Sequence, residues 1–105
     1  MKTPCEHAVW EVLPKIRASI AWVMVREYRL RAHQVSECLG VSDAAVSQYL
    51  SGKRGKIITD ERVMAVIRTT VEAALNRENH EIVPDELCVI CRTYRNVDVD
   101  QAAPL

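Results

Sequence analysis

The stretch from Gln34 to Leu50, QVSECLGVSDAAVSQYL, constrains the fold of this chain more than any other. It fits two short helices joined by a tight turn at Gly40, where the backbone turns without a Cβ penalty. Its apolar positions are Val35, Leu39, Val41, Val46 and Tyr49. Ser36 is a small residue where the two helices cross, and Ser42 is a suitable N-cap for the second helix. The pattern predicts a helix-turn-helix, with an ordinary helical hairpin as the alternative.

The rest of the chain has helical periodicity, with aliphatic residues at three- and four-residue steps and no Phe. Thr3 and Pro4 begin a first helix, and Asp60 is the expected N-cap of a long one. We expect helices over residues 3–12, 15–28, 32–39, 43–50, 61–79 and 85–95. The prediction is an all-α helical bundle in which a helix-turn-helix core carries one additional helix at each terminus. Residues 1–96 form a single domain, and 97–105 form a flexible tail.

Charge is distributed unevenly along a chain whose formal net charge is zero. Residues 13–57 carry eight cations against three acids, a net charge of plus five. Residues 78–100 carry six acids against two cations, a net charge of minus four. The helix-turn-helix lies in the basic half, as binding to phosphate requires.

The second helix of the motif presents polar side chains away from its apolar face. Those expected to meet DNA base edges are Ser42, Asp43, Ala44, Ser47, Gln48 and Ser51. Gln48 is the strongest candidate because a carboxamide pairs with adenine in a bidentate way. For Asp43 a role at the helix N-terminus is favoured over acceptance from cytosine, since the helix dipole favours a carboxylate there.

A basic loop follows that helix. Lys53, Arg54 and Lys56 are expected to contact phosphate, with a merely solvated loop as the alternative. A single small module binds weakly, so the expected assembly is a homodimer on double-stranded DNA with a palindromic or inverted-repeat site.

Four cysteines are the second feature with chemical meaning. Cys88 and Cys91 form a CxxC that shares one helix face, and Cys5 lies in the first turn of the first helix. Cys38 lies in the helix-turn-helix and, taken alone, more often is a small buried side chain. The predicted metal ligands are Cys5, Cys38, Cys88 and Cys91.

Four thiolates suit two kinds of centre. The apolar neighbours Leu87, Val89 and Ile90 favour an iron–sulfur cluster of the 4Fe–4S type over zinc, although the repeated CxxC of ferredoxins is absent. The CxxC also suits a reversible disulfide or a pair of inert buried thiols. If Cys38 is a ligand, loss of the centre disturbs the adjacent helix, which makes the centre a redox or iron sensor.

The segment LPKIRASIAWVMVREYRLRAHQVSECLGVSDAAVSQYLSGKRG resembles the Xre/λ-repressor-like helix-turn-helix regulators. A short archaeal and bacterial group with a PCE start, LPxIRA and AAVSQYLSGKRG is the most similar, and the likeness covers most of residues 4–56. Short members of that group end in a cysteine-containing helix like residues 87–92. Many Xre proteins place Gln at the start of the first motif helix to hold phosphate, and this chain has Ala32 there.

These observations predict a sequence-specific DNA-binding transcriptional regulator with a cysteine-ligated sensor. The alternatives are a zinc-stapled constitutive DNA-binding protein, a thiol-disulfide redox-switch regulator and an antitoxin-like interaction module. An enzyme is not expected, because neither a nucleotide-binding glycine loop nor a catalytic triad is evident, so no small-molecule substrate is expected. The start MKTPCEH has no apolar signal segment and the run at residues 20–25 is too short for a bilayer, so we expect a cytoplasmic location without a membrane partner.

Overall fold

The computed structural model describes residues 12–53 and 55–102, the last six of these by their backbone alone. This part of the chain contains five α-helices and no strand, so the predicted all-α fold is confirmed. The helices are α2 (Leu13–Arg26), α3 (Ala32–Leu39), α4 (Asp43–Leu50), α5 (Glu61–Leu75) and α6 (Pro84–Ala102). The helix expected over residues 3–12 lies outside the described residues except for Val12, which is the N-cap of α2.

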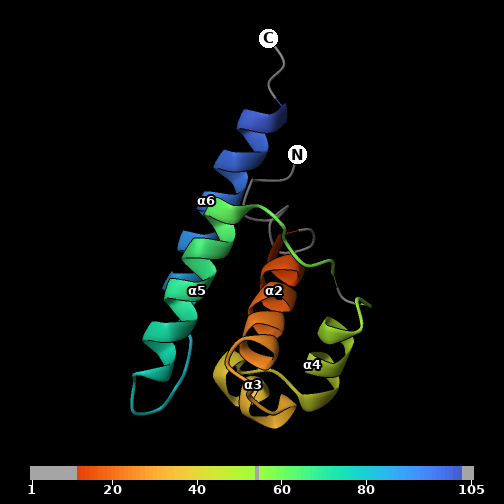
Figure 1. Ribbon diagram of the computed structural model, residues 1–105, viewed down its shortest axis with the longest axis vertical. Helices are drawn as coiled ribbons and strands as arrows, with labels where there is room; N and C mark the ends of the chain where they lie inside the picture. Colours follow the sequence, from red (N-terminus) through yellow and green to blue (C-terminus); the bar gives the residue numbers. More distant parts are fainter. Residues whose placement is uncertain (1–11, 54, 103–105) are drawn as a thin grey trace.

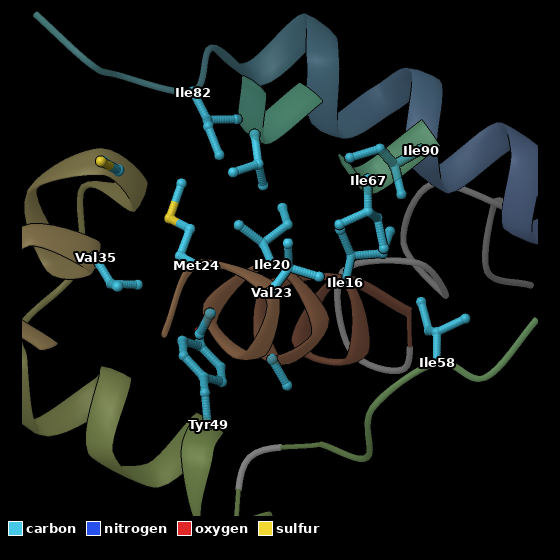
Figure 2. Close-up of a cluster of buried hydrophobic side chains, with 14 of the residues drawn as sticks. Ile16, Ile20, Val23, Met24, Val35, Tyr49, Ile58, Ile67, Ile82 and Ile90 are labelled. Atoms are coloured by element: carbon cyan, nitrogen blue, oxygen red, sulfur yellow. The ribbon is translucent and has the colours of Figure 1, made fainter. Parts of the chain in front are cut away.

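Helix α2 is the centre of the molecule. It contacts each of the other four helices, and Figure 1 shows it between α4 on one side and the pair α5 and α6 on the other. Its apolar side chains at 16, 20, 23 and 24 are fully buried, because the three- and four-residue steps place them on the face that all four neighbours cover. Figure 2 shows these side chains surrounded by Val35, Tyr49, Ile67 and Ile90, each from a different helix.

Two polar contacts fasten the connecting segments to this core. The Ser19 hydroxyl of α2 is buried, donates to the Lys15 carbonyl at 2.7 Å and accepts from the Ile58 N–H at 2.8 Å. The Ile82 N–H donates to the Cys38 carbonyl at 2.9 Å, which ties the segment before α6 to the end of α3. Both bonds satisfy backbone groups that burial would otherwise leave unpaired.

Two ion pairs link α5 to its neighbours α2 and α6. Arg68 of α5 donates to Glu27 beyond the end of α2 at 3.0 Å. Arg77, just past α5, donates to both carboxylate oxygens of Glu86 of α6 at 2.6 Å. Hydrogen bonding from the arginine lowers the pKa of each of these two carboxyls.

The expected boundaries of three helices are wrong at one or both ends. Helix α2 begins at Leu13 rather than residue 15, because Pro14 fits the first turn, where N–H groups lack helical partners. It ends at Arg26 rather than residue 28, since the N–H groups of Glu27 and Tyr28 both bond to the Val23 carbonyl. Helix α5 ends at Leu75 rather than residue 79, although its predicted N-cap, Asp60, is confirmed by bonds from the N–H groups of residues 62 and 63.

The largest boundary error concerns α6. We expected it to end near residue 95 and residues 97–105 to form a flexible tail, but the helix continues to Ala102. The missing amphipathic pattern misled the prediction, because an established helix propagates through polar residues as long as each adds a backbone bond. Neither Gly nor Pro occurs between Pro84 and Pro104 to stop it. None of the helices in the described ranges is long and apolar enough to cross a membrane.

Candidate nucleic-acid interface

The turn between α3 and α4 has the geometry that the sequence predicted. Gly40 adopts a left-handed backbone with φ +68°, and its N–H bonds to the Ser36 carbonyl. The Val41 N–H bonds to the same carbonyl at 3.0 Å. Ser42 then caps α4, because its hydroxyl accepts from the Ala45 N–H at 3.1 Å. Both helices of the motif have the predicted bounds, residues 32–39 and 43–50.

One face of α4 is buried against α2 and α3, which fixes the direction of the other face. Ala45, Val46 and Tyr49 are 4%, 0% and 4% exposed. Among the predicted contact residues, those exposed are Ser42, Asp43, Ala44, Ser47 and Ser51. Gln48 lies at the edge of this face, where its side chain is half-buried. Figure 1 shows α4 at the outer margin of the molecule, on the far side of α2 from α5.

Asp43 lies in the first turn of α4, as predicted, and it also contacts α3. Its carboxylate neither caps α4, a role that belongs to Ser42, nor projects freely from the helix. It lies 2.6 Å from the hydroxyl of Ser36 and 3.2 Å from His33 Nδ1, both on α3. We therefore describe Asp43 as a tie between the two helices of the motif.

His33 on α3 completes this contact between the two helices. Its side chain is 71% exposed, its Nδ1 faces Asp43, and its Nε2 lies 2.8 Å from a carboxylate oxygen of Glu37 one helical turn away. Only an imidazole ring protonated on both nitrogens can donate a hydrogen bond to each of the two carboxylates, Asp43 and Glu37. Hydrogen bonding to Asp43 raises the pKa of His33, and a hydrogen bond from Ser36 lowers the pKa of Asp43.

The basic loop after α4 is held close to the start of α2. Lys53 and Lys56 are exposed, and Arg54 lies outside the described residues. Gly55 has φ +144°, and a Cβ at this position would lie 2.9 Å from the Pro14 carbonyl group. The loop backbone therefore packs directly on α2 at a place where only glycine fits, and this contact fixes where the two lysines emerge.

The three described cysteines differ in environment. Cys38 and Cys91 are buried and Cys88 is exposed, while Cys5 lies outside the described residues. Burial raises the pKa of the Cys38 thiol, which opposes formation of the thiolate that a metal needs. Within the described ranges no three or more Cys, His, Asp or Glu side chains form a group that could hold a metal ion. The iron–sulfur or zinc centre therefore stays a prediction from the sequence.

Comparison of the chain with protein-family models, with curated proteins and with solved structures gives no match. The geometry of the chain's own residues is therefore the basis on which its function is inferred.

Proposed function

We propose that this chain is a DNA-binding regulator that places α4 in the major groove of double-stranded DNA. The single observation that carries the proposal is the exposed polar face of α4, flanked at its C-terminal end by exposed lysines. An α-helix with its side chains is about 10–12 Å across, and the major groove is about 12 Å wide. The width of the groove therefore suits a helix such as α4.

The side chains of that face suit base edges. Ser47 has a hydroxyl that donates or accepts, and Ala44 has a methyl group that suits the methyl group of thymine. Gln48, at the edge of the face, has a half-buried side chain whose carboxamide suits adenine when it extends towards the groove. Contacts of these kinds carry sequence information.

The loop side chains suit the DNA backbone. Lys53 and Lys56 are exposed, and neither forms an ion pair with a carboxylate in the described part of the chain. Such cations bind phosphate and release counterions, which gives affinity that falls steeply with salt. Because one short helix reads few base pairs, the proposal includes two copies of the chain on an inverted-repeat site.

The salt dependence of DNA affinity tests this function. Fluorescence anisotropy of a labelled duplex, selected from a random pool, gives the slope of log K against log salt concentration. The double variant Lys53→Gln/Lys56→Gln should flatten that slope by about 2, because each lysine neutralises one phosphate. Arg92→Gln, which removes an exposed cation on α6, is the matched control and should leave the slope unchanged. An unchanged slope in the lysine variant, or a binding constant insensitive to salt, contradicts the proposal.

A further inference from the structure

A pocket opens between α2 and α4. It has a volume of about 380 Å³ and is lined by Trp22, Val25 and Arg26 of α2, by Arg29 of the following turn and by Leu50, the last residue of α4. This volume is in the range of sites that hold small organic ligands. No part of the proposed DNA contact uses these five residues.

The lining combines an apolar wall with two positive charges. Trp22, Val25 and Leu50 supply an indole ring and two aliphatic side chains, and Arg26 and Arg29 are both exposed. Neither arginine pairs with a carboxylate in the part of the chain that the structure describes, although Glu27 lies between them. Glu27 is instead bound to Arg68 of α5. The pocket therefore keeps two guanidinium groups without an acid to neutralise them.

The backbone at Arg29 is left-handed, as it also is at His80. Its φ is +57°, a left-handed conformation that glycine adopts easily and that is unfavourable for a residue with a Cβ. The Leu30 N–H bonds to the Met24 carbonyl at 2.9 Å across this turn, so the conformation is held by the fold. A turn that favours glycine instead carries a long cationic side chain at the edge of the pocket. Strain of this kind clusters at ligand sites.

We propose that this pocket binds a small amphiphilic anion, an aromatic or aliphatic body that bears one carboxylate. A guanidinium group pairs with a carboxylate through two parallel hydrogen bonds, and an indole packs against an aromatic ring. A backbone phosphate of DNA satisfies the two arginines but leaves the apolar wall uncovered, which is why a free small molecule suits the lining better. Because Leu50 ends α4, the bound molecule contacts the proposed recognition helix directly and is placed to regulate it.

Titration with 2-naphthoate tests the site, with the Trp22 indole N–H signal in NMR spectra as the readout. The signal is assigned through Trp22→Phe, and the neutral amide of the same ring system serves as the ligand control. We expect a saturable shift with naphthoate and about tenfold weaker binding of the amide, since the amide cannot form the charged pairs. Arg26→Gln/Arg29→Gln should weaken naphthoate binding at least tenfold, and Arg92→Gln should not. Equal binding of acid and amide, or no saturable shift at millimolar naphthoate, overturns the proposal.

Two further measurements separate this site from DNA binding and from a folding defect. Arg26→Gln/Arg29→Gln should bind a short duplex as tightly as the wild type does; if duplex binding weakens, the pocket is a backbone contact and the proposal is wrong. Arg29→Gly relieves the left-handed strain, so it should raise the melting temperature while it weakens naphthoate binding. A variant that gains stability and keeps full affinity would also overturn the assignment. The site is independent of the proposed function, because naphthoate binding is measured without DNA.

Discussion

Charged residues on the α5 side of the molecule and those beside α4 lie in different electrostatic settings. Arg68 binds Glu27 just after α2 at 3.0 Å, and Arg77 binds Glu86 of α6 at 2.6 Å, so these charges stabilise contacts between helices. Lys53 and Lys56 are exposed and have no carboxylate partner in the described ranges. Cations that the fold itself does not neutralise are available to an external anion. Under the proposed function, α5 and α6 support the molecule and the α4 side contacts DNA.

The two sides nevertheless share one core, because α2 contacts both. Ile20 is fully buried at the middle of α2, where the side chains of the two regions meet (Figure 2). Ile20→Ala should lower the free energy of unfolding by about 2–5 kcal/mol, since it removes buried methyl groups and leaves a cavity. Urea denaturation should give one transition by both circular dichroism and tryptophan fluorescence.

The control for this variant is Val83→Ala, because Val83 is 41% exposed and its truncation should change stability by at most about 0.5 kcal/mol. Two separate transitions in Ile20→Ala would show that the α4 side and the α5 side fold independently. The comparison between them would then concern two units rather than two faces of one core.

The glycines of the basic loop offer a smaller and more local test. Gly52 and Gly55 both have positive φ, but a Cβ at Gly52 meets no atom within 4 Å, whereas one at Gly55 meets the Pro14 backbone at 2.9 Å. Gly52→Ala should therefore lower the free energy of unfolding only through the strain of a left-handed backbone, by about 1 kcal/mol, and Gly55→Ala should lower it by about 1–3 kcal/mol because the loop must also move. Thermal unfolding ranks the two variants.

Under the proposed function, displacement of the loop in Gly55→Ala also weakens DNA binding more than Gly52→Ala does. Equal stability of the two variants would mean that the contact between the loop and α2 is not what positions Lys53 and Lys56.

Local signals in the sequence predicted the α4 side well. Gly40 and Ser42 are sufficient to define the turn and the start of α4, because a left-handed glycine and a serine N-cap act within three residues. Asp60 defined the start of α5 in the same way. The end of α6 was not predictable by the same reasoning, because no capping residue marks it and its last turns have no apolar face.

Contacts between distant residues were not predictable from local patterns. The spacing of His33 and Glu37 is a visible signal for a pair on one helix face, but the bond from His33 to Asp43 depends on the angle at which α3 and α4 meet. The pocket between Trp22 and Leu50 likewise exists only once α4 packs on α2. The cysteine prediction had the same weakness, because helix periodicity placed Cys88 and Cys91 on one face without showing what that face contacts.

The smallest expected effect is a dependence on pH that distinguishes the two regions. The tie from His33 to Asp43 and Glu37 requires a charged ring, and the fold raises the pKa of His33 above its ordinary value near 6.5. Its stabilising contribution is therefore complete below pH 6.5 and is lost as pH rises through the raised pKa. The pKa of Asp43 is lowered, so the stability that its carboxylate contributes is present above pH 3.8 and is lost as pH falls through its pKa in the folded state. The tie should thus act in mildly acidic to near-neutral solution.

Melting temperatures of the wild type and of His33→Gln across pH 5–9 measure this contribution. The wild type should melt higher at pH 5–6, and the difference should shrink towards zero as the solution becomes alkaline. It should also shrink in 1 M salt, because exposed charges are screened there. The arginine–glutamate ties of α5 and α6 remain charged over this whole range, so they add no slope of their own. A difference that grows with pH would mean that the imidazole is neutral in the folded chain and that Asp43 binds α3 through Ser36 alone.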